Sequence, residues 1–521
     1  MSTAISEPVE TDSDQTSIPW VDPNIIHPRS LLLKLTERLR LNGIEVHETQ
    51  GDKEAVPLDA RMHDRAAIVP ALVVSPRGEW AISQALQAMN DLSVYQKIPI
   101  SVKSGGHGYF NGATCSGIML NLGQMTACRV TGDILTVEPG CVLGRIVYIL
   151  AKHGKAVPHG DCYGVGAGGH FTTAGWDLLL TRRYGIGCQS VVGGRIVLWD
   201  GIVLDVDEHN HPDLLHAIRG GAAAGAGVVS EIRLRVIDEP AHATWRLTSL
   251  DKRQLQKCVD HHAFSRAAEL PEDITVAFRF FFVQDQEDPI CSFNIFSMLG
   301  PAETMQHLYR HLGAEVATLL DDPDMWNEKT LLDLRLLPAS RILSTNPDML
   351  SEVSATRLQD SPLLFWEKGM IQREMGSSFL ETSSYWVKTD CDEMLPKIYE
   401  RFQEVKNLPM RERMYALVIM GGGDSLRRQH ECSMPIGKAL ARFEVHWDDV
   451  DDAYECRMFA GTVSNVLRSQ QDDGVGRPFR GDIWKQEQAC SKADRLRGIL
   501  GQFDRRKTRK SGGRQARTMK L

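Results

Sequence analysis

A histidine set among glycines follows a short apolar stretch near residue 100. Residues 103–109 read Lys-Ser-Gly-Gly-His-Gly-Tyr, directly after a strand expected over 98–102. Two adjacent glycines let the main chain approach a bulky anion, and their N–H groups can cradle phosphate oxygens. On this segment alone, a plain turn with a structural histidine at His107 is the competing interpretation.

A second segment is richer in glycine. Residues 159–170 read His-Gly-Asp-Cys-Tyr-Gly-Val-Gly-Ala-Gly-Gly-His, with five glycines between 160 and 169. A loop with so few side chains can wrap closely around a flat ligand. The alternative is a flexible surface loop, but Val165, Phe171 and Trp176 lie in or beside the segment, and a solvated linker does not need such apolar residues.

The elements that would position these loops are short and regular. Helical spacing is expected over 31–41, 79–92 and 212–219, and strands over 71–74, 98–102 and 228–236. Residues 195–206 predict a hairpin, because Asp200-Gly201 supplies the positive φ angles that a two-residue turn needs. This half predicts an α+β domain.

After about residue 240 the glycine density falls and amphipathic helices alternate with strands. Helices are expected over 303–312 and 392–405, and strands over 276–283, 292–297, 414–420 and 441–447. We predict a second α+β domain built on an antiparallel sheet.

Composition excludes several classes of protein. The chain of 521 residues has a formal net charge of −8, which predicts no general affinity for nucleic acid or anionic membranes. Its eleven cysteines form no CxxC pair, so we expect no metal site and mostly free thiols. The polar, acidic first twenty residues do not resemble a secretory signal, which predicts a cytoplasmic protein. Residues 505–521 are basic and are expected to be disordered.

Together the two glycine segments resemble FAD-linked oxidases of the vanillyl-alcohol oxidase and berberine bridge enzyme type, whose FAD-binding domain is of the PCMH type. In that family a strand leads into Arg-Ser-Gly-Gly-His, and members with two flavin bonds carry Gly-x-Cys-x-x-Val-Gly-x-Gly-Gly-His. Residues 103–107 and 160–170 are similar to these patterns, and the likeness extends over about 66–238.

The resemblance implies a fold and a division of the chain. The fold class is α+β, with a two-subdomain FAD-binding domain and an α+β substrate domain that has an antiparallel sheet. The implied parts are an N-terminal lead and first helix (1–65), the FAD-binding domain (66–238), the substrate domain (239–472), a return to the FAD domain (473–504) and the basic tail (505–521).

The resemblance also implies FAD bound covalently through His107 and Cys162. An imidazole and a thiolate are suitable nucleophiles toward an oxidised flavin ring. The cofactor-binding residues implied are Lys103, Ser104, Gly105, Gly106, His107, Gly108, Tyr109, Cys162, Val165, Gly166, Gly168, Gly169, His170, Gly175 and Val229. Val165 matches a position where valine is typical of members that react with O₂; simple core packing is its alternative role.

The chain departs from the family pattern in several places. The small-residue loop over 221–227 lacks the usual Asn-Phe, and Gln189-Ser190 replaces Asp-Asn. The stretch 477–482 has no tyrosine where the family places a catalytic one, and 503–507 lacks the usual ending. The family's glutamate base aligns with Leu440. These departures put the catalytic base in doubt.

A replacement for that base is expected on the strand over 441–447. Arg442, Glu444 and His446 alternate there and should share one face of the sheet. We predict Glu444 or His446 as the catalytic base, since either could be tuned near the operating pH in a covered pocket. A solvated strand face is the alternative, and His170 beside the flavin loop is a further candidate.

The sequence therefore predicts an O₂-dependent flavin oxidase acting on a small organic molecule, an alcohol or amine of secondary metabolism or a sugar, with H₂O₂ as by-product. A flavin dehydrogenase with another acceptor and a flavin-binding protein with altered catalysis are the alternatives. The sequence indicates neither the substrate nor the oligomeric state.

Overall fold

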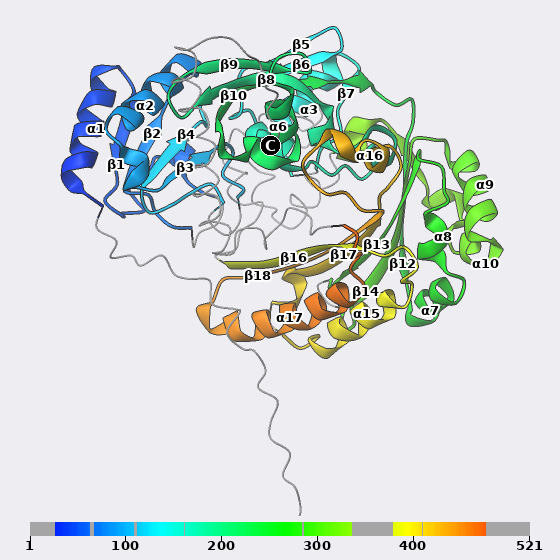
Figure 1. Ribbon diagram of the computed structural model, residues 1–521. Coiled ribbons are helices and arrows are strands. Elements are labelled where there is room, and N and C mark those ends of the chain that lie inside the picture. The colour runs from blue at the N-terminus through cyan, green and yellow to red at the C-terminus, as the bar shows by residue number, and fades with distance from the viewer. Residues whose placement is uncertain are drawn as a thin grey trace, which may run out of the picture.

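The computed structural model describes residues 27–62, 67–108, 112–160, 162–283, 286–335, 379–408 and 410–475. Three sheets of four or more strands organise these residues, each with its own apolar core, and a two-stranded sheet accompanies them. The α+β class expected from the sequence is confirmed. Figure 1 shows the two smaller sheets side by side in the N-terminal half, above the large sheet of the second half.

The first sheet has four short strands in the order β1-β2-β4-β3. Its strands are β1 (Glu45–Glu48), β2 (Leu72–Ser75), β3 (Ile100–Lys103) and β4 (Ile118–Asn121). Strands β2, β4 and β3 are parallel, and β1 is antiparallel. Helices α1 (Arg29–Leu41) and α2 (Glu79–Asp91) bury their apolar faces against this sheet. The helices and strands expected here are confirmed within a few residues.

The second sheet is antiparallel, in the order β5-β6-β10-β8-β9. Its strands are β5 (Cys128–Thr131), β6 (Ile134–Val137), β8 (Val191–Leu198), β9 (Val203–Asp207) and β10 (Gly227–Arg235). Helices α3 (Leu143–Lys152), α4 (Ala167–Thr173) and α6 (Pro212–Gly221) pack on its core. A two-stranded pair, β7 (Lys155–Ala156) with β11 (Ile237–Asp238), lies beside it.

The hairpin expected over 195–206 exists, but its two-residue turn is wrong. Gly201 has a φ of 84°, whereas Asp200 is not among the described residues with positive φ. The Gly201 N–H donates to the Leu198 carbonyl at 2.8 Å. A turn with ordinary φ at Asp200 and a left-handed glycine after it is one residue longer than the tight form, in which both central residues have positive φ.

The third sheet has seven antiparallel strands in the order β15-β12-β14-β13-β17-β18-β16. Its strands are β12 (Ala243–Leu250), β13 (Ile274–Phe281), β14 (Ile290–Ser297), β15 (Asn327–Lys329), β16 (Phe379–Val387), β17 (Met414–Met420) and β18 (Ala439–Trp447). The antiparallel sheet expected for the second half is confirmed.

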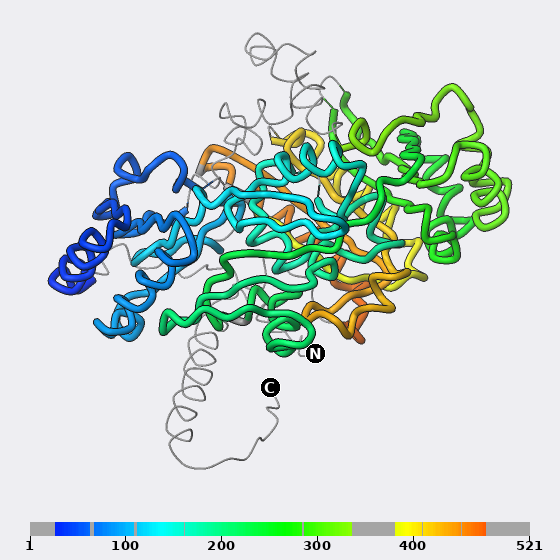
Figure 2. The backbone as a smooth tube through the Cα atoms, turned by 90° about the horizontal axis from the view of Figure 1, so that it is seen from above, coloured from blue at the N-terminus to red at the C-terminus, as the bar shows by residue number. Residues whose placement is uncertain are grey.

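The two faces of this large sheet have different partners. One face packs on a layer of helices to form the largest core of the described residues. These helices include α7 (Lys252–Asp260), α8 (Ala263–Ala267), α9 (Pro301–Leu312), α10 (Ala314–Ala317), α15 (Met394–Glu404) and α17 (Ala453–Ser469). Figure 1 shows α15 and α17 on the side away from the N-terminal half. The other face is turned toward that half, and Figure 2 shows α1 (blue) and α9 (light green) at opposite ends of the molecule.

Local sequence explains where these helices begin and end. Pro301 starts α9, where its missing N–H is no loss, and Gly313 ends the helix with a φ of 84°. Asp251 caps α7 by accepting from the Gln254 N–H, and the Gln254 side chain accepts from the Asp251 N–H. The capping residues therefore satisfy terminal N–H groups of α7, and Pro301 and Gly313 set the bounds of α9.

Candidate functional site

The two glycine segments meet. A β-carbon added to Gly105 would overlap the backbone nitrogen of Gly166, and one added to Gly166 would overlap the Ser104 hydroxyl and the Gly105 nitrogen. The backbones are so close that neither position can hold a side chain. The two segments that the resemblance assigns to one FAD are therefore in direct contact in the fold.

Hydrogen bonds from Ser104 and Gly168 to a shared acceptor stabilise this contact. The Ser104 hydroxyl and the Gly168 N–H both donate to the Pro139 carbonyl, the second at 2.9 Å. The loop continues along the start of α3, where the Leu143 N–H donates to the Val165 carbonyl at 2.9 Å. The stretch that follows β6 is therefore the platform on which both glycine loops rest.

The two predicted attachment residues lie close to the contact along the chain. His107 is two residues beyond Gly105, and Cys162 is four residues before Gly166. Two residues span at most about 7 Å even when extended, and the Val165 N–H closes a turn onto the Cys162 carbonyl at 3.2 Å. Both side chains are half-buried, which suits groups that must reach a cofactor yet remain shielded.

Lys103 is buried beneath the first loop. Its ammonium donates to the Asp59 carbonyl at 2.7 Å, to the Ser104 carbonyl at 3.1 Å and to Asn121 Oδ1 at 3.4 Å. Burial lowers the pKa of Lys103 to about 8. The structure thus shows an anchor that joins the end of β3 to β4 and to η2 (Leu58–Ala60).

His170 closes the second loop on itself. The Gly160 N–H donates to His170 Nε2 at 3.1 Å, so this nitrogen is an acceptor and the imidazole is neutral. Burial, reinforced by the charge of Arg335, lowers the pKa of His170 to about 4. The sequence left open whether His170 is a base or a structural residue. These contacts are those of a structural residue.

The other predicted cofactor residues have varied surroundings. Gly106 has a φ of 83°, and Gly175 has a φ of 95°, conformations that favour glycine. Val165 and Val229 are half-buried beside the core of the second sheet. Gly108 and Gly169 lie in the loop and in α4, respectively, and Tyr109 lies outside the described residues.

A polar cluster occupies the inner face of the large sheet. Glu444 on β18 is 2% exposed, and its carboxylate pairs with Arg442 and accepts a hydrogen bond from the Tyr415 hydroxyl of β17. His446 Nε2 lies 3.7 Å from Glu444 Oε2. The predicted alternation of Arg442, Glu444 and His446 on one face is confirmed, and the alternative of a solvated strand face is wrong for Glu444.

The surroundings of His446 favour its neutral form. Burial lowers the pKa of His446 to about 4, and the charges of Arg442 and Arg413 act in the same direction, whereas Asp448 opposes them. Arg413 and Asp448 form an ion pair with each other. At neutral pH the imidazole is therefore an uncharged donor and acceptor beside the Glu444 carboxylate.

Two members of this cluster were missed by sequence reasoning. Tyr415 lies directly across the β17–β18 ladder from Glu444. Arg279 on β13 stacks on Tyr415, with 5.0 Å from its guanidinium carbon to the ring centroid. Both sit at polar positions of predicted strands, so the period of two could have placed them on the inner face. The pairing of strands distant in sequence could not be read in advance.

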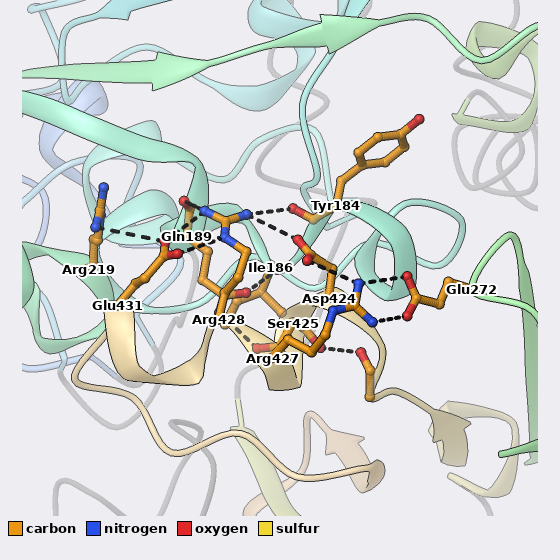
Figure 3. A network of polar contacts seen from close by, with 11 residues as sticks. Tyr184, Ile186, Gln189, Arg219, Glu272, Asp424, Ser425, Arg427, Arg428 and Glu431 are labelled. Carbon is orange, nitrogen blue, oxygen red and sulfur yellow. Dashed lines mark hydrogen bonds and ion pairs between the residues drawn. The ribbon is translucent and has the colours of Figure 1, made fainter. Parts of the chain in front are cut away.

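A polar clasp joins this sheet to the N-terminal half (Figure 3). Arg428 follows α16 (Asp424–Arg427) and donates to the Gln189 carbonyl at 2.8 Å and to the Tyr184 carbonyl at 3.3 Å. The Gln189 side chain donates to the Ser425 carbonyl at 2.9 Å and accepts from the Ile186 N–H at 3.0 Å. Gln189, a departure from the family pattern, is thus part of the contact between the two halves.

The residues present fit an FAD. The contact between Gly105 and Gly166 leaves a backbone surface without side chains, and half-buried His107 and Cys162 flank it. The inner face of the large sheet, with its proton-accepting groups, is turned toward the same half of the molecule (Figure 1). Within the described ranges no helix is both long and apolar enough to cross a membrane.

Comparison with known proteins supports the same cofactor. Residues 70–207 match the family described as FAD binding domain. Residues 70–207 are therefore an FAD-binding domain, and FAD is the cofactor. The match includes both glycine segments and ends within β9.

Curated relatives match the chain over a limited part. Berberine bridge enzyme-like 23 of Arabidopsis thaliana is 30% identical over 215 residues, 40% of each chain. Glucooligosaccharide oxidase of Sarocladium strictum is 32% identical over 203 residues, 38% of this chain and 39% of the relative. Chitooligosaccharide oxidase of Gibberella zeae is 31% identical over 186 residues, 35% of this chain and 37% of the relative. The match thus spans about two fifths of these relatives.

Solved structures extend the likeness of fold to most of the chain. BBE-like 28 from Arabidopsis thaliana has a TM-score of 0.70 at 14% identity, covering 87% of this chain and 89% of that one. Phl p 4, a grass pollen allergen described as having glucose dehydrogenase activity, has a TM-score of 0.68 at 16% identity, covering 86% and 87%. The chain has the fold of berberine bridge enzyme-like proteins, as the sequence predicted.

Proposed function

We propose that this protein is an oxidase that uses covalently held FAD to oxidise an alcohol or amine of a small organic molecule, with O₂ as the final acceptor and H₂O₂ as by-product. The observation that carries the proposal is the placement of two glycine loops and one proton-accepting cluster on facing parts of the fold. The oligosaccharide oxidases among the relatives make sugars the first substrates to examine.

Two residues would hold the cofactor. His107 carries the imidazole and Cys162 the thiol nearest along the chain to the Gly105–Gly166 contact, and the resemblance assigns both as points of attachment. When bound, FAD supplies a two-electron acceptor whose chemistry the protein positions. A cofactor held by two bonds is retained even when its potential is raised.

The proton would be taken by Glu444 through Tyr415. The Tyr415 hydroxyl donates to Glu444, so a proton accepted at the Tyr415 oxygen can be balanced by transfer of the phenolic proton to the carboxylate. Arg442 stabilises the negative charge of Glu444 before the transfer. A positioned acid–base group of this kind contributes about 10²–10⁴ in rate.

His446 is the competing base. Its imidazole is neutral at pH 7 because burial lowers its pKa to about 4, and it is less buried than Glu444. Replacing Tyr415 and His446 separately distinguishes the two, since only the first replacement interrupts the path to Glu444.

Val165 would govern the reaction with O₂. Its side chain is half-buried in the second glycine loop and packs beside the core of the second sheet. A larger side chain at this position is expected to slow reoxidation and to favour another acceptor, as in the dehydrogenase alternative.

Rapid mixing of the photoreduced protein with O₂ tests the oxidase proposal. Fast reoxidation that slows at least tenfold in Val165→Leu, with the flavin content unchanged, is the expected result. Slow reoxidation of the wild-type protein would favour the dehydrogenase alternative. Absence of turnover with any sugar, alcohol or amine in a broad panel would favour the non-catalytic alternative.

A further inference from the structure

Arg279 brings a positive charge to the inner face of the large sheet. It lies on β13, and its guanidinium carbon is 5.3 Å from the Phe281 ring centroid and 5.0 Å from that of Tyr415. The side chain is half-buried, and its Nε is fully buried. Contacts with two aromatic rings hold the guanidinium beside Tyr415 and Glu444, the candidate residues for proton transfer.

This charge has no acidic partner among the described residues. Arg442 pairs with Glu444, and Arg413 pairs with Asp448. The side chain of Arg279 makes no ion pair and no hydrogen bond within the part of the chain that the structure describes. The described cluster therefore carries one surplus positive charge.

Two buried hydroxyl groups next to the cluster also lack a partner among the described residues. Thr382 lies directly opposite Glu444 on β16, and Ser384 lies opposite Arg442. Both are buried, at 2% and 3% exposure, and neither hydroxyl has a hydrogen-bond partner among the described residues. Burial of a hydroxyl without a partner is unfavourable, so these groups fit a ligand with hydrogen-bonding groups.

We infer that the substrate is a sugar acid, a polyhydroxylated molecule with one carboxylate that pairs with Arg279. A guanidinium presents a planar fork of donors that matches a carboxylate. The surplus of one charge matches a monoanion rather than a phosphate ester with two charges. Thr382 and Ser384 provide hydrogen bonds for the hydroxyl groups. This inference rests on the proposed function and specifies its substrate class.

The geometry also separates the roles of these residues. Arg279 reaches the cluster from the β13 side of Tyr415, whereas Thr382 and Ser384 flank Glu444 and Arg442 from the opposite strand. A ligand that contacts Arg279 on one side and Thr382 and Ser384 on the other would extend across Tyr415 and Glu444. One of its hydroxyl groups would then lie next to the Tyr415 hydroxyl.

Calorimetric titration of the purified, flavin-containing protein tests the inference without turnover. The probes are D-galacturonate, its neutral methyl ester, D-galactose and D-galactose 6-phosphate. We expect D-galacturonate to bind at least tenfold more tightly than the ester and the phosphate, with an affinity that falls as salt is raised. Equal affinity for acid and ester, preference for the phosphate or absence of binding by all four would overturn the inference.

Variants locate the charge. Arg279→Gln should reduce the affinity for D-galacturonate at least tenfold and leave that for the ester unchanged, and Arg279→Lys should restore part of the difference. Thr382→Val should weaken both ligands about equally. Arg411→Gln is the matched control, because Arg411 stacks on Phe282, which belongs to the core on the helix side. A preference for the acid that persists in Arg279→Gln contradicts the assignment.

Oxygen consumption separates this inference from the proposed function. If D-galacturonate binds but no substrate of the panel causes O₂ consumption, the proposed oxidase function is contradicted and the inferred ligand class still holds. Turnover of neutral sugars without preference for the acid would support the oxidase and overturn the ligand class. If the protein oxidises a sugar acid, Arg279→Gln should raise the KM for that acid at least tenfold and change kcat little.

Discussion

The backbone nitrogen of Gly166 occupies the space in which a β-carbon of Gly105 would lie. The two glycines are 61 positions apart in the sequence. Their contact brings the loop after β3 against the loop before α4. Because the half-buried residues His107 and Cys162 follow and precede this contact, its geometry decides whether both can reach one cofactor.

Gly166→Ala should therefore separate the loops. The added methyl group would overlap backbone and the Ser104 hydroxyl, and overpacking of this kind costs about 1–3 kcal/mol. We expect the ratio of flavin to protein absorbance to fall by at least half and the melting temperature to fall. Gly461→Ala in α17 is the control, because nothing lies within 4 Å of its added β-carbon and the residue has no role in binding the cofactor. Full flavin content in Gly166→Ala would contradict this view of the contact.

Tyr415→Phe should lower kcat by about 10²-fold or more while retaining flavin, because it removes the hydroxyl that donates to Glu444 but leaves the Arg442 pair intact. Glu444→Gln should lower kcat similarly. Glu444→Gln also leaves Arg442 without its counter-charge, which can lower the free energy of unfolding by about 3–5 kcal/mol. The melting temperature of this variant is therefore measured in parallel. Steady-state oxygen consumption gives the rates. His446→Gln as the more damaging change would instead assign the base to His446.

Stability should depend on pH through His446. Its pKa in the folded protein is about 4 because of burial and neighbouring arginines, below the unfolded value of about 6.5. The unfolded chain therefore binds the proton first as pH falls, so the stability present above pH 6.5 is lost between 6.5 and about 4. The difference amounts to about 3 kcal/mol. Urea unfolding at pH 7 and pH 4.5 should show a smaller loss for His446→Gln than for the wild type; an equal loss would be inconsistent with a buried neutral imidazole.

The clasp between the halves should depend on Arg428 more than on its neighbour. Arg428 donates to two carbonyls of the N-terminal half, whereas the Arg427 side chain is 59% exposed and pairs with Glu272. Arg428→Ala should cost about 2–3 kcal/mol and reduce kcat, whereas Arg427→Ala should change both clearly less, because an exposed ion pair contributes little to stability. Denaturant unfolding and oxygen consumption measure both effects. Equal effects of the two variants would show that the clasp does not set the spacing between the halves.

Local patterns predicted the elements that hold the site. Strand β17 was expected over the residues it occupies, and β18 begins two residues before the expected start. The glycine loops were recognised because glycine and a preceding strand are signals within a short window. Alternation placed Glu444 and His446 on one face because a strand has a period of two.

Partners from distant strands could not be predicted in this way. Tyr415 meets Glu444 across 29 residues, and Arg279 joins them through the pairing of β13 with β17. The order of strands in the sheet decides these contacts, and no short window of sequence encodes it. The burial of Lys103 under three acceptors likewise depends on Asp59 and Asn121, which come from separate elements.

The central claim is that His107 and Cys162 reach the same flavin. Acid precipitation followed by intact mass and peptide mapping tests it most directly. The account predicts a protein that stays yellow after precipitation, with flavin linking the peptides that contain His107 and Cys162, and loss of the covalent flavin only when both residues are replaced by alanine. A colourless precipitate with all the flavin released into the supernatant would contradict it.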